Sequence, residues 1–198
     1  VIFMMIEEKL KKFKEIVEMS NNIVFFGGAG VSTESGIPDF RSKDGLYHQK
    51  YQYPPEEILS HTFFMNHTEE FYEFYKEKLN ALKYEPNITH IKLAQLEKKN
   101  KLKAIITQNI DGLHQKAGSQ KVYELHGSIY RNYCMKCHQF YDAEYVFKGN
   151  SLVPNCKCGG IIKPDVVLYG EMLPNDYTKA IYEISESDML IVAGTSLT

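Results

Sequence analysis

The sequence predicts an α/β protein built on a parallel sheet with helices on both faces. Two observations carry this prediction: short apolar segments alternate with amphipathic ones, and glycine-rich or polar tips follow several of the apolar segments. Strands of a parallel sheet are covered on both faces, so they occur as continuous apolar runs of this length. With 198 residues, 43% of them hydrophobic, the chain can form one substantial core with small appended modules.

The strands and helices are expected in a regular order along the chain. Apolar runs predict strands at 23–26, 104–107, 122–125, 166–169 and 189–194. Helical periodicity predicts helices over 7–19, 68–82, 88–98 and 176–186, the third with Asn87 as its N-cap and with Lys99 and Asn100 after its end. We expect two sets of helical side chains to be buried: Leu10, Phe13, Ile16 and Val17, and Ile88, Ile91 and Leu96.

Composition divides the chain into three expected parts. The sheet domain is expected to comprise 1–42, 84–129 and 165–198. Residues 43–83 are rich in aromatic and acidic side chains, show no strand pattern and predict a helical insertion. Residues 130–164 contain all four cysteines and predict a small metal-binding module.

A glycine-rich turn follows the first predicted strand, at Gly28, Ala29 and Gly30. Glycines at the carboxyl end of a parallel strand permit a tight turn and let backbone amides approach a phosphate, although the same turn also occurs without a ligand. Three hydroxyl side chains follow as candidate donors: Ser32, Thr33 and Ser35. The spacing is not G-x-G-x-x-G, and no clear acid follows about twenty residues later to bind a ribose, as a dehydrogenase requires.

The next residues do not continue a dinucleotide-binding helix. Pro38 is expected to end any helix, which places Asp39, Phe40 and Arg41 on a loop near the glycine turn. An exposed aromatic ring between opposite charges on a ligand loop favours a binding role over a plain surface turn with a local ion pair.

Short clusters of mainly polar residues follow three further predicted strands. They are Gln108, Asn109, Ile110 and Asp111 after the second strand, His126 after the third, and Thr195 and Ser196 after Gly194 in the last. Because the carboxyl ends of parallel strands share one edge, we expect these tips to form one site with the glycine turn. His126 stands directly at a strand end, and an imidazole can accept a proton at neutral pH.

The four cysteines predict a zinc site. Cys134 and Cys137 form one close pair and Cys156 and Cys158 a second, with eighteen residues between the pairs. Two such pairs can supply four thiolates to one tetrahedral zinc ion, and a site with four protein ligands is structural rather than catalytic. The second pair is tighter than the usual C-x-x-C, so His138 remains an alternative ligand.

Charge and hydropathy narrow the classes of partner. The net charge is −2, and acidic and basic residues are interspersed, so nucleic acid is not an expected partner. The apolar runs are too short to span a bilayer, and no secretion-signal pattern is visible. We therefore expect a cytoplasmic protein without membrane contacts, and favour a monomer.

Taken together, six segments resemble the signature segments of sirtuins, which are NAD-dependent protein lysine deacylases. They are GAGVSTESGIPDFR, TQNIDGLH, ELHGS, the four cysteines, KPDVVLYGE and AGTSL, and the resemblance spans residues 24–198. It implies a Rossmann-like domain, a zinc module and a helical module, with NAD⁺ and acyl-lysine meeting in the cleft between them. It also implies two further strands and an asparagine-bearing loop after Thr198, so we expect weaker NAD⁺ binding in the present chain.

The resemblance assigns roles to residues by position. It implies NAD⁺ contacts for Gly28, Ala29, Gly30, Thr33, Phe40, Arg41, Gln108, Gly194, Thr195 and Ser196. It implies a nicotinamide pocket lined by Phe40, Ile110 and Asp111, with Asp39 ordering the loop. Asn109 would lie by the ribose and a water, and His126 would be the general base. The substrate peptide would add as a strand beside Val166, Val167, Leu168, Tyr169, Gly170 and Glu171.

The resemblance also implies the reaction and the acyl group. Nicotinamide would leave, the acetyl-lysine oxygen would capture the ribose, and the products would be lysine, nicotinamide and O-acetyl-ADP-ribose. Relatives that prefer succinyl-lysine carry a Tyr-x-x-Arg pair, whereas the matching segment here gives Tyr72 and Tyr75 without an arginine. Acetyl or another uncharged acyl group is therefore expected.

Three other functions stay open from the sequence. A mono-ADP-ribosyltransferase would use the same cleft without an acylated substrate. An NAD(P)H oxidoreductase is disfavoured by the Pro38 break and the missing ribose acid, and a zinc-binding module without catalysis is disfavoured by the placement of Asn109 and His126.

Overall fold

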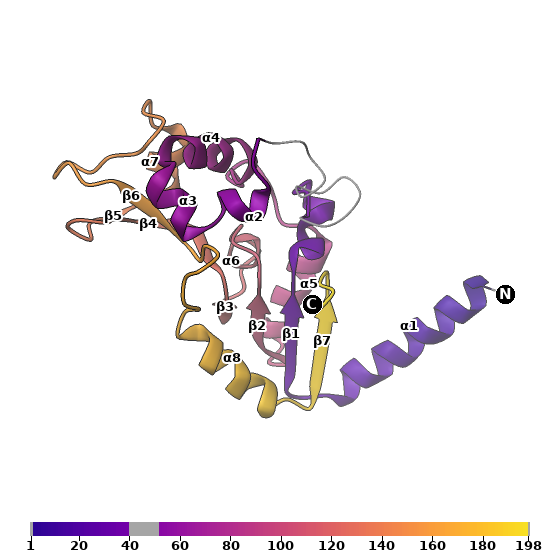
Figure 1. The fold of residues 1–198 in the computed structure, drawn as a ribbon. Coiled ribbons are helices and arrows are strands. Elements are labelled where there is room, and N and C mark those ends of the chain that lie inside the picture. The colour runs from indigo at the N-terminus through magenta and orange to yellow at the C-terminus, as the bar shows by residue number, and fades with distance from the viewer. Residues whose placement is uncertain (1, 40–51, 198) are drawn as a thin grey trace.

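A parallel sheet with the strand order β3-β2-β1-β7 lies at the centre of one part of the molecule (Figure 1). The computed structural model describes residues 2–39 and 52–197. The strands of this sheet are β1 (Ile23–Gly27), β2 (Leu102–Thr107), β3 (Val122–Glu124) and β7 (Met189–Ala193). Every pairing among them is parallel, which confirms the predicted α/β class.

The helices of the described residues flank this sheet or belong to the insertion and the cysteine segment. Those associated with the sheet are α1 (Ile2–Met19), the 3₁₀ helix η1 (Ala29–Ser35), α5 (Ile88–Lys98), α6 (Leu113–Lys116) and α8 (Asp176–Ser185). The others are α2 (Pro55–Ile58), α3 (His61–Asn66), α4 (Thr68–Lys78) and α7 (Ala143–Lys148). None of them is long and apolar enough to cross a membrane.

Successive side chains of β1 lie in different cores. Ile23 packs in one cluster with Leu93 of α5, whereas Val24 packs in another with Ala180 of α8. Because the side chains of a strand alternate between the two faces of a sheet, α5 and α8 cover opposite faces. The prediction of helices on both faces is confirmed.

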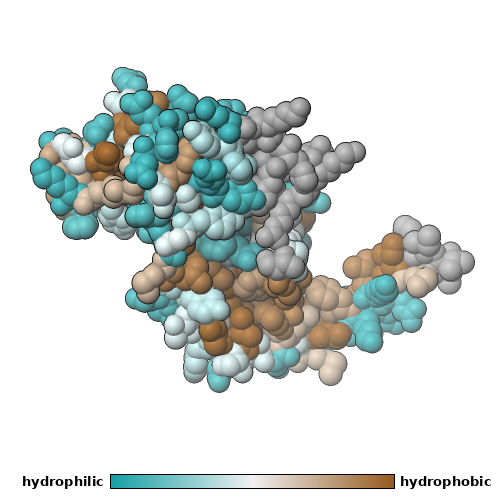
Figure 2. All heavy atoms as spheres, viewed as in Figure 1, coloured by the Kyte–Doolittle hydropathy of each residue, from teal (hydrophilic) through white to brown (hydrophobic). Residues whose placement is uncertain are grey.

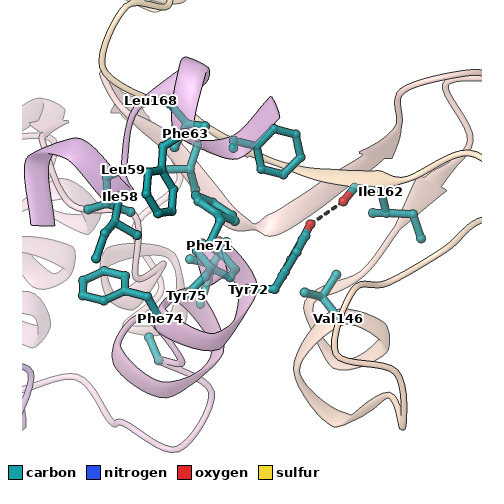
Figure 3. Close-up of a cluster of buried hydrophobic side chains, with 14 of the residues drawn as sticks. Ile58, Leu59, Phe63, Phe71, Tyr72, Phe74, Tyr75, Val146, Ile162 and Leu168 are labelled. Atoms are coloured by element: carbon teal, nitrogen blue, oxygen red, sulfur yellow. Dashed lines mark hydrogen bonds between the residues drawn. The ribbon is translucent and has the colours of Figure 1, made fainter. Parts of the chain in front are cut away.

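The helical insertion and the cysteine segment share a third core. The cysteine segment forms an antiparallel sheet of β5 (Phe140–Tyr141), β4 (Gly127–Cys134) and β6 (Ile162–Val166). Figure 3 shows Tyr72 of α4 pointing toward Ile162, and the Tyr72 hydroxyl donates a hydrogen bond to the Ile162 carbonyl. Phe71 and Tyr75 of α4 belong to the same buried cluster as Val146 and Ile162. The two segments therefore pack as one unit, and the division of the chain at the expected boundaries stays a prediction.

The predicted strand at 166–169 was displaced from the observed one. β6 ends at Val166, and its partners are the residues of β4 from Gly127 to Cys134. Beyond it, Leu168 is 1% exposed and Tyr169 makes an isolated bridge to Ser60 of the insertion. The residues after Val166 are thus apolar because they are buried beside the insertion, and among the described residues they do not form a strand with a hydrogen-bonded partner strand.

The buried face of α5 also differs from the expected one. Its buried side chains are His90, Leu93 and Ala94, whereas Ile88 is 56% and Ile91 40% exposed. The expected face was wrong for these two isoleucines because the helix turns a polar residue, His90, toward the protein. Leu96 is partly buried, as expected.

The first helix was likewise expected to bury more than it does. Leu10, Phe13 and Ile16 are exposed, and Val17 alone among the predicted set packs against the sheet cluster. Figure 1 shows α1 extending away from the sheet, so only its last turn reaches a core. Figure 2 shows apolar side chains at the surface of α1 and over the sheet, where Leu190 of β7 is also exposed.

Candidate functional site

The polar tips of the parallel strands meet at one edge of the sheet, as predicted. The Gly28 amide donates to the Ala193 carbonyl (3.1 Å), which joins the ends of β1 and β7. The Gln108 amide donates to the Gly27 carbonyl (2.9 Å), and Nδ1 of His126 lies 3.0 Å from the Gln108 carbonyl oxygen. Hydrogen bonds therefore connect the tips after β7, β1, β2 and β3 in order.

Close packing between strand ends explains the glycines. A Cβ atom on Gly28 would lie 2.7 Å from Oε1 of Gln108 and from the Gly194 carbonyl, and one on Gly30 would lie 2.8 Å from the Gly194 Cα. The Gly30 amide donates to the Gly194 carbonyl (2.9 Å), and Gly194 has a positive φ of 66°. Two amides that the pattern suggested for a phosphate are thus already hydrogen-bonded within the protein.

The helix after the glycine turn ends earlier than expected. It is the 3₁₀ helix η1, which begins at Ala29 and ends before Gly36, whose φ of 93° and amide bonds to the last turn make it the C-cap. Gly36 rather than Pro38 therefore ends this helix. The Thr33 hydroxyl is exposed and donates to the Gly30 carbonyl (2.9 Å).

The remaining predicted cofactor residues lie around this turn or outside the described residues. Asp39 is partly buried, and Phe40 and Arg41 lie outside the described residues. Thr195 is partly buried and Ser196 is exposed, just after the carboxyl end of β7.

A buried polar network lies behind the strand ends. The Ser32 hydroxyl donates to Oδ2 of Asp111 (2.6 Å) and accepts from Nδ2 of Asn109 (3.1 Å). The other carboxylate oxygen of Asp111 accepts from the Leu113 amide (2.9 Å), and Ile110 packs partly buried against the insertion core. Ser32 was expected to offer its hydroxyl to a ligand, but it is 1% exposed and holds the two predicted site residues together.

The chemistry of His126 follows from its surroundings. A carbonyl oxygen only accepts, so the bond to Gln108 places a proton on Nδ1 and leaves the lone pair of the neutral ring on Nε2. Burial lowers the pKa of His126 below its usual value of 6.5, against a smaller raising effect of the Gln108 carbonyl. The ring is partly exposed. It can therefore accept a proton from a bound molecule near neutral pH.

The predicted peptide segment lies next to this histidine. The Val167 amide donates to the His126 carbonyl (3.0 Å). The Tyr169 amide donates to the Leu59 carbonyl and its own carbonyl accepts from the His61 amide, both at 2.9 Å. This backbone thus runs from the end of β6 past His126 and attaches to the helical insertion.

Glu171 fixes the end of this segment. Its Oε2 accepts from the Leu168 amide (2.9 Å) and lies 3.1 Å from Nζ of Lys163, and its Oε1 lies 2.9 Å from Nδ1 of His61. Burial raises the pKa of Glu171, but these three partners outweigh it and hold the pKa below its usual value. Gly170, with a φ of 89°, makes the turn.

The four cysteine sulfurs form a compact group. All lie within 4.8 Å of one another, with Cys134–Cys158 and Cys137–Cys156 at 3.5 Å and Cys137–Cys158 at 3.4 Å. Zinc bound tetrahedrally by thiolates at 2.3 Å requires sulfurs about 3.8 Å apart. The donor set therefore fits a structural zinc ion.

The turns around the sulfurs are shaped for this geometry. A Cβ atom on Gly160 would lie 2.6 Å from Sγ of Cys134. His138 has a positive φ of 60° and donates its amide to the Cys134 carbonyl (2.9 Å). Within the described residues His138 is not among the grouped ligands, which resolves the ligand set in favour of four cysteines.

The sequence analysis did not place two buried histidines near the site. His90 is 0% and His114 1% exposed, and their ring centroids lie 4.7 Å apart behind the network of Ser32. Each stands three residues after a side chain that caps a turn, Asn87 or Asp111. That spacing from a capping side chain was the only sequence feature that the two histidines share. It does not show that their rings meet, because the ring contact depends on how α5 and α6 pack together.

Comparison with known proteins agrees with this geometry. The model described as "Sir2 family" matches residues 28–198. A curated relative from Clostridium acetobutylicum, named NAD-dependent protein deacetylase, is 60% identical over 198 residues, covering 98% of this chain and 81% of the relative. The solved structure "Sir2-p53 peptide-NAD+" is 43% identical with a TM-score of 0.84 and covers 96% of this chain and 77% of its own.

A second solved structure, "Sir2 bound to acetylated peptide", has 42% identity and a TM-score of 0.84, and covers 96% of this chain and 76% of its own. The family model matches far more than half of the chain, and the relatives are similar over nearly its whole length. The chain therefore belongs to the Sir2 family.

Proposed function

We propose that this protein is an NAD⁺-dependent protein lysine deacetylase that removes acetyl, or another uncharged acyl group, from lysine. The observation that carries the proposal is the meeting, at one edge, of the glycine turn, the Asn109–Asp111 network, the His126 ring and the backbone of the 167–169 segment. The Clostridium relative named NAD-dependent protein deacetylase supports it, as do the solved Sir2 structures with NAD⁺ and with acetylated peptide.

The NAD⁺ site would lie over the strand ends. Its proposed contacts are Gly28, Ala29, Gly30, Thr33, Asp39, Phe40, Arg41, Gln108, Asn109, Ile110, Asp111, His126, Gly194, Thr195 and Ser196. The buried amide and carboxylate of Asn109 and Asp111 are held in place by Ser32, so they can present fixed hydrogen-bonding groups to nicotinamide and ribose.

His126 would act as the proton acceptor. After the nicotinamide–ribose bond breaks, the acetyl-lysine oxygen bonds to the ribose C1′. Nε2 of His126 then takes a ribose hydroxyl proton, and the 2′-oxygen attacks the imidate carbon. Water completes the transfer, which yields lysine, nicotinamide and O-acetyl-ADP-ribose. General-base assistance of this kind contributes about 10²–10⁴-fold.

The peptide would add as an extended strand beside Val166, Val167, Leu168, Tyr169, Gly170 and Glu171. The chain contains two arginines, Arg41 and Arg131, and Arg131 is held by Glu124 (2.6 Å) and Asp165 (2.7 Å). Tyr72 and Tyr75, which match the succinyl-selecting segment, are buried in the insertion core. An acyl group without charge is therefore favoured.

Zinc would be structural. Cys134 and Cys156 belong to the same buried cluster as Phe71 of the insertion. When bound, the ion would hold the two cysteine pairs together. Because the cysteines share a core with the insertion, the ion would also stabilise the insertion backbone that binds Tyr169. No step of the reaction passes through it.

The proposal is tested by incubating the chain with NAD⁺ and an acetyl-lysine peptide. We expect nicotinamide release that requires the acetyl group, with one deacetylated peptide and one O-acetyl-ADP-ribose per nicotinamide. ADP-ribose attached to protein without dependence on acetylation would indicate a transferase. Formation of NADH would indicate an oxidoreductase, and no consumption of NAD⁺ would indicate a binding module.

We also propose a cytoplasmic, monomeric protein that does not bind nucleic acid. Four unpaired cysteines suited to zinc favour a reducing compartment. The near-balanced charge supports the absence of nucleic-acid binding.

A further inference from the structure

A buried histidine connects a helix terminus to the proposed nicotinamide site. His90 occupies the third position of α5, and its Nδ1 accepts a hydrogen bond from the Asn87 backbone amide (3.2 Å). Asn87 in turn accepts from the Thr89 amide (2.9 Å), which completes a capping box. Since an amide nitrogen only donates, Nδ1 of His90 carries the lone pair, and the proton of the neutral ring is on Nε2.

That proton faces the Ser32 hydroxyl. Nε2 of His90 lies 3.5 Å from Oγ of Ser32. A hydroxyl has one donor and two acceptor positions. Its donor is used on Asp111, one acceptor position is used by Asn109, and the Nε2–H of His90 lies at the limit of hydrogen-bond reach for the second.

Burial keeps His90 suited to this role. The side chain is 0% exposed, and the His114 ring packs edge-on against it at 4.7 Å. Burial lowers the pKa of His90, against a smaller raising effect of Asp111, so the neutral donor form persists at physiological pH. The ring can hardly turn away, because its other nitrogen is tied to the helix cap.

We propose that His90 is a positioning residue, which acts through Ser32 to fix Asn109 and Asp111 for reaction with NAD⁺. The inference rests on the proposed function. A side chain that is held by a complete set of hydrogen bonds stays near its productive geometry, and a displacement of about 1 Å can cost on the order of 10²-fold in rate. The competing explanation is that His90 serves only as a helix cap and as core filling.

Two substitutions separate these explanations, because each keeps one of the two ring-nitrogen positions. Asparagine places an oxygen near Nδ1, so H90N can accept from the Asn87 amide but cannot reach Ser32. Glutamine places its amide near Nε2, so H90Q can donate to Ser32 with the cap bond weakened. L93A is the control for stability, because Leu93 lies on the same helix, is 5% exposed and packs in the apolar sheet cluster.

The measurements are the melting temperature, the kinetic constants for NAD⁺ and acetylated peptide, and the ¹⁵N NMR signals of the Asn109 side-chain amide. We expect H90N to lower kcat/KM for NAD⁺ at least tenfold and to shift the Asn109 signals, with an unchanged KM for peptide. H90Q should stay within about threefold of the unsubstituted chain although its melting temperature falls. L93A should lower the melting temperature without moving the Asn109 signals or kcat/KM.

The opposite ordering would overturn the inference. If H90N keeps kcat/KM and the Asn109 signals while H90Q loses both, His90 is a cap only. In the S32A background, H90N should lower kcat/KM for NAD⁺ by less than a further factor of about three, since its effect passes through Ser32. If the losses from S32A and H90N add in full, His90 does not act through Ser32. Should the unsubstituted chain fail to consume NAD⁺, the proposed function fails, and the Asn109 signals still decide the role of His90.

Discussion

Nδ1 of His126 lies 3.0 Å from the carbonyl oxygen of Gln108, so one hydrogen bond joins the tip after β3 to the tip after β2. The acceptor belongs to the backbone, and the backbone of Gln108 is itself tied by its amide to Gly27 at the end of β1 (2.9 Å). The tautomer of the proposed base is therefore set by the sheet, and a side-chain substitution at position 108 should leave it intact.

The lowered pKa of His126 predicts the acid limb of the pH profile. Because burial disfavours the imidazolium, the neutral base persists below the usual pKa of 6.5. We expect kcat/KM for NAD⁺ to fall with a midpoint below pH 6.5, since this constant reports the free enzyme. A midpoint above 6.5 would show that His126 is stabilised in its charged form and would contradict the assignment.

His114 predicts part of the acid sensitivity of the fold. Burial, with a smaller effect of His90, lowers its pKa to about 3, and neither ring nitrogen has a hydrogen-bond partner within the described part of the chain. The unfolded chain takes up a proton near pH 6.5, whereas the folded chain does not. Stability is therefore present above pH 6.5 and is lost as pH falls from 6.5 toward 3.

Replacing the His114 imidazole should remove its share of the loss of stability at acid pH. We expect H114L to fold, and to lose less stability between pH 7.5 and pH 5 than the unsubstituted chain, by roughly 2 kcal/mol for one such histidine. Urea unfolding at the two pH values measures the difference. Equal pH dependence of the two proteins would mean that His114 is charged or hydrated in the folded state.

Removal of zinc should disrupt the insertion as well as the cysteine segment. We expect one zinc per chain, and a chelator should lower the melting temperature, increase binding of a hydrophobic dye and stop turnover, because Cys134 and Cys156 belong to the insertion core. C134S should lose the metal, whereas H138A should keep it. Structure and turnover that survive chelation would contradict a structural zinc.

Tyr72 and Tyr75 offer a matched pair in the insertion core. The Tyr72 hydroxyl donates to the Ile162 carbonyl, whereas the Tyr75 hydroxyl is buried without a partner among the described residues. Y72F should destabilise the fold by about 1 kcal/mol, and Y75F should be neutral or stabilising. Urea unfolding compares them. Neither change should alter acyl preference, and a switch toward succinyl-lysine in either variant would place its hydroxyl in the substrate pocket.

The sequence predicted the features that depend on local pattern. The Asn87 cap follows from the chemistry of a helix terminus, and the shared edge of Gly28, Gln108, His126 and Thr195 follows from parallel strands. The spacing of the two cysteine pairs is typical of a zinc site, so it predicted that the four sulfurs lie close together.

Features that depend on tertiary packing were not predictable. The exposure of Ile88 depends on which face of α5 packs against the protein, and that face carries His90 instead. Ser32 looked like a ligand donor because serine is usually exposed, yet η1 turns it toward Asp111. The segment after Val166 looked like a strand because it is apolar. Leu168 is indeed buried, but the only bridge of this segment among the described residues joins Tyr169 to Ser60, which is distant in sequence.

The proton-acceptor role of His126 is tested most directly by separating the two halves of the reaction in H126A. With an acetyl-lysine peptide present, exchange of labelled nicotinamide into NAD⁺ should continue, while formation of deacetylated peptide should fall about 10²–10⁴-fold at an unchanged melting temperature. The matched control is H67A, which replaces an exposed histidine of the insertion and should behave like the unsubstituted chain. Deacetylation by H126A at the unsubstituted rate would contradict the account.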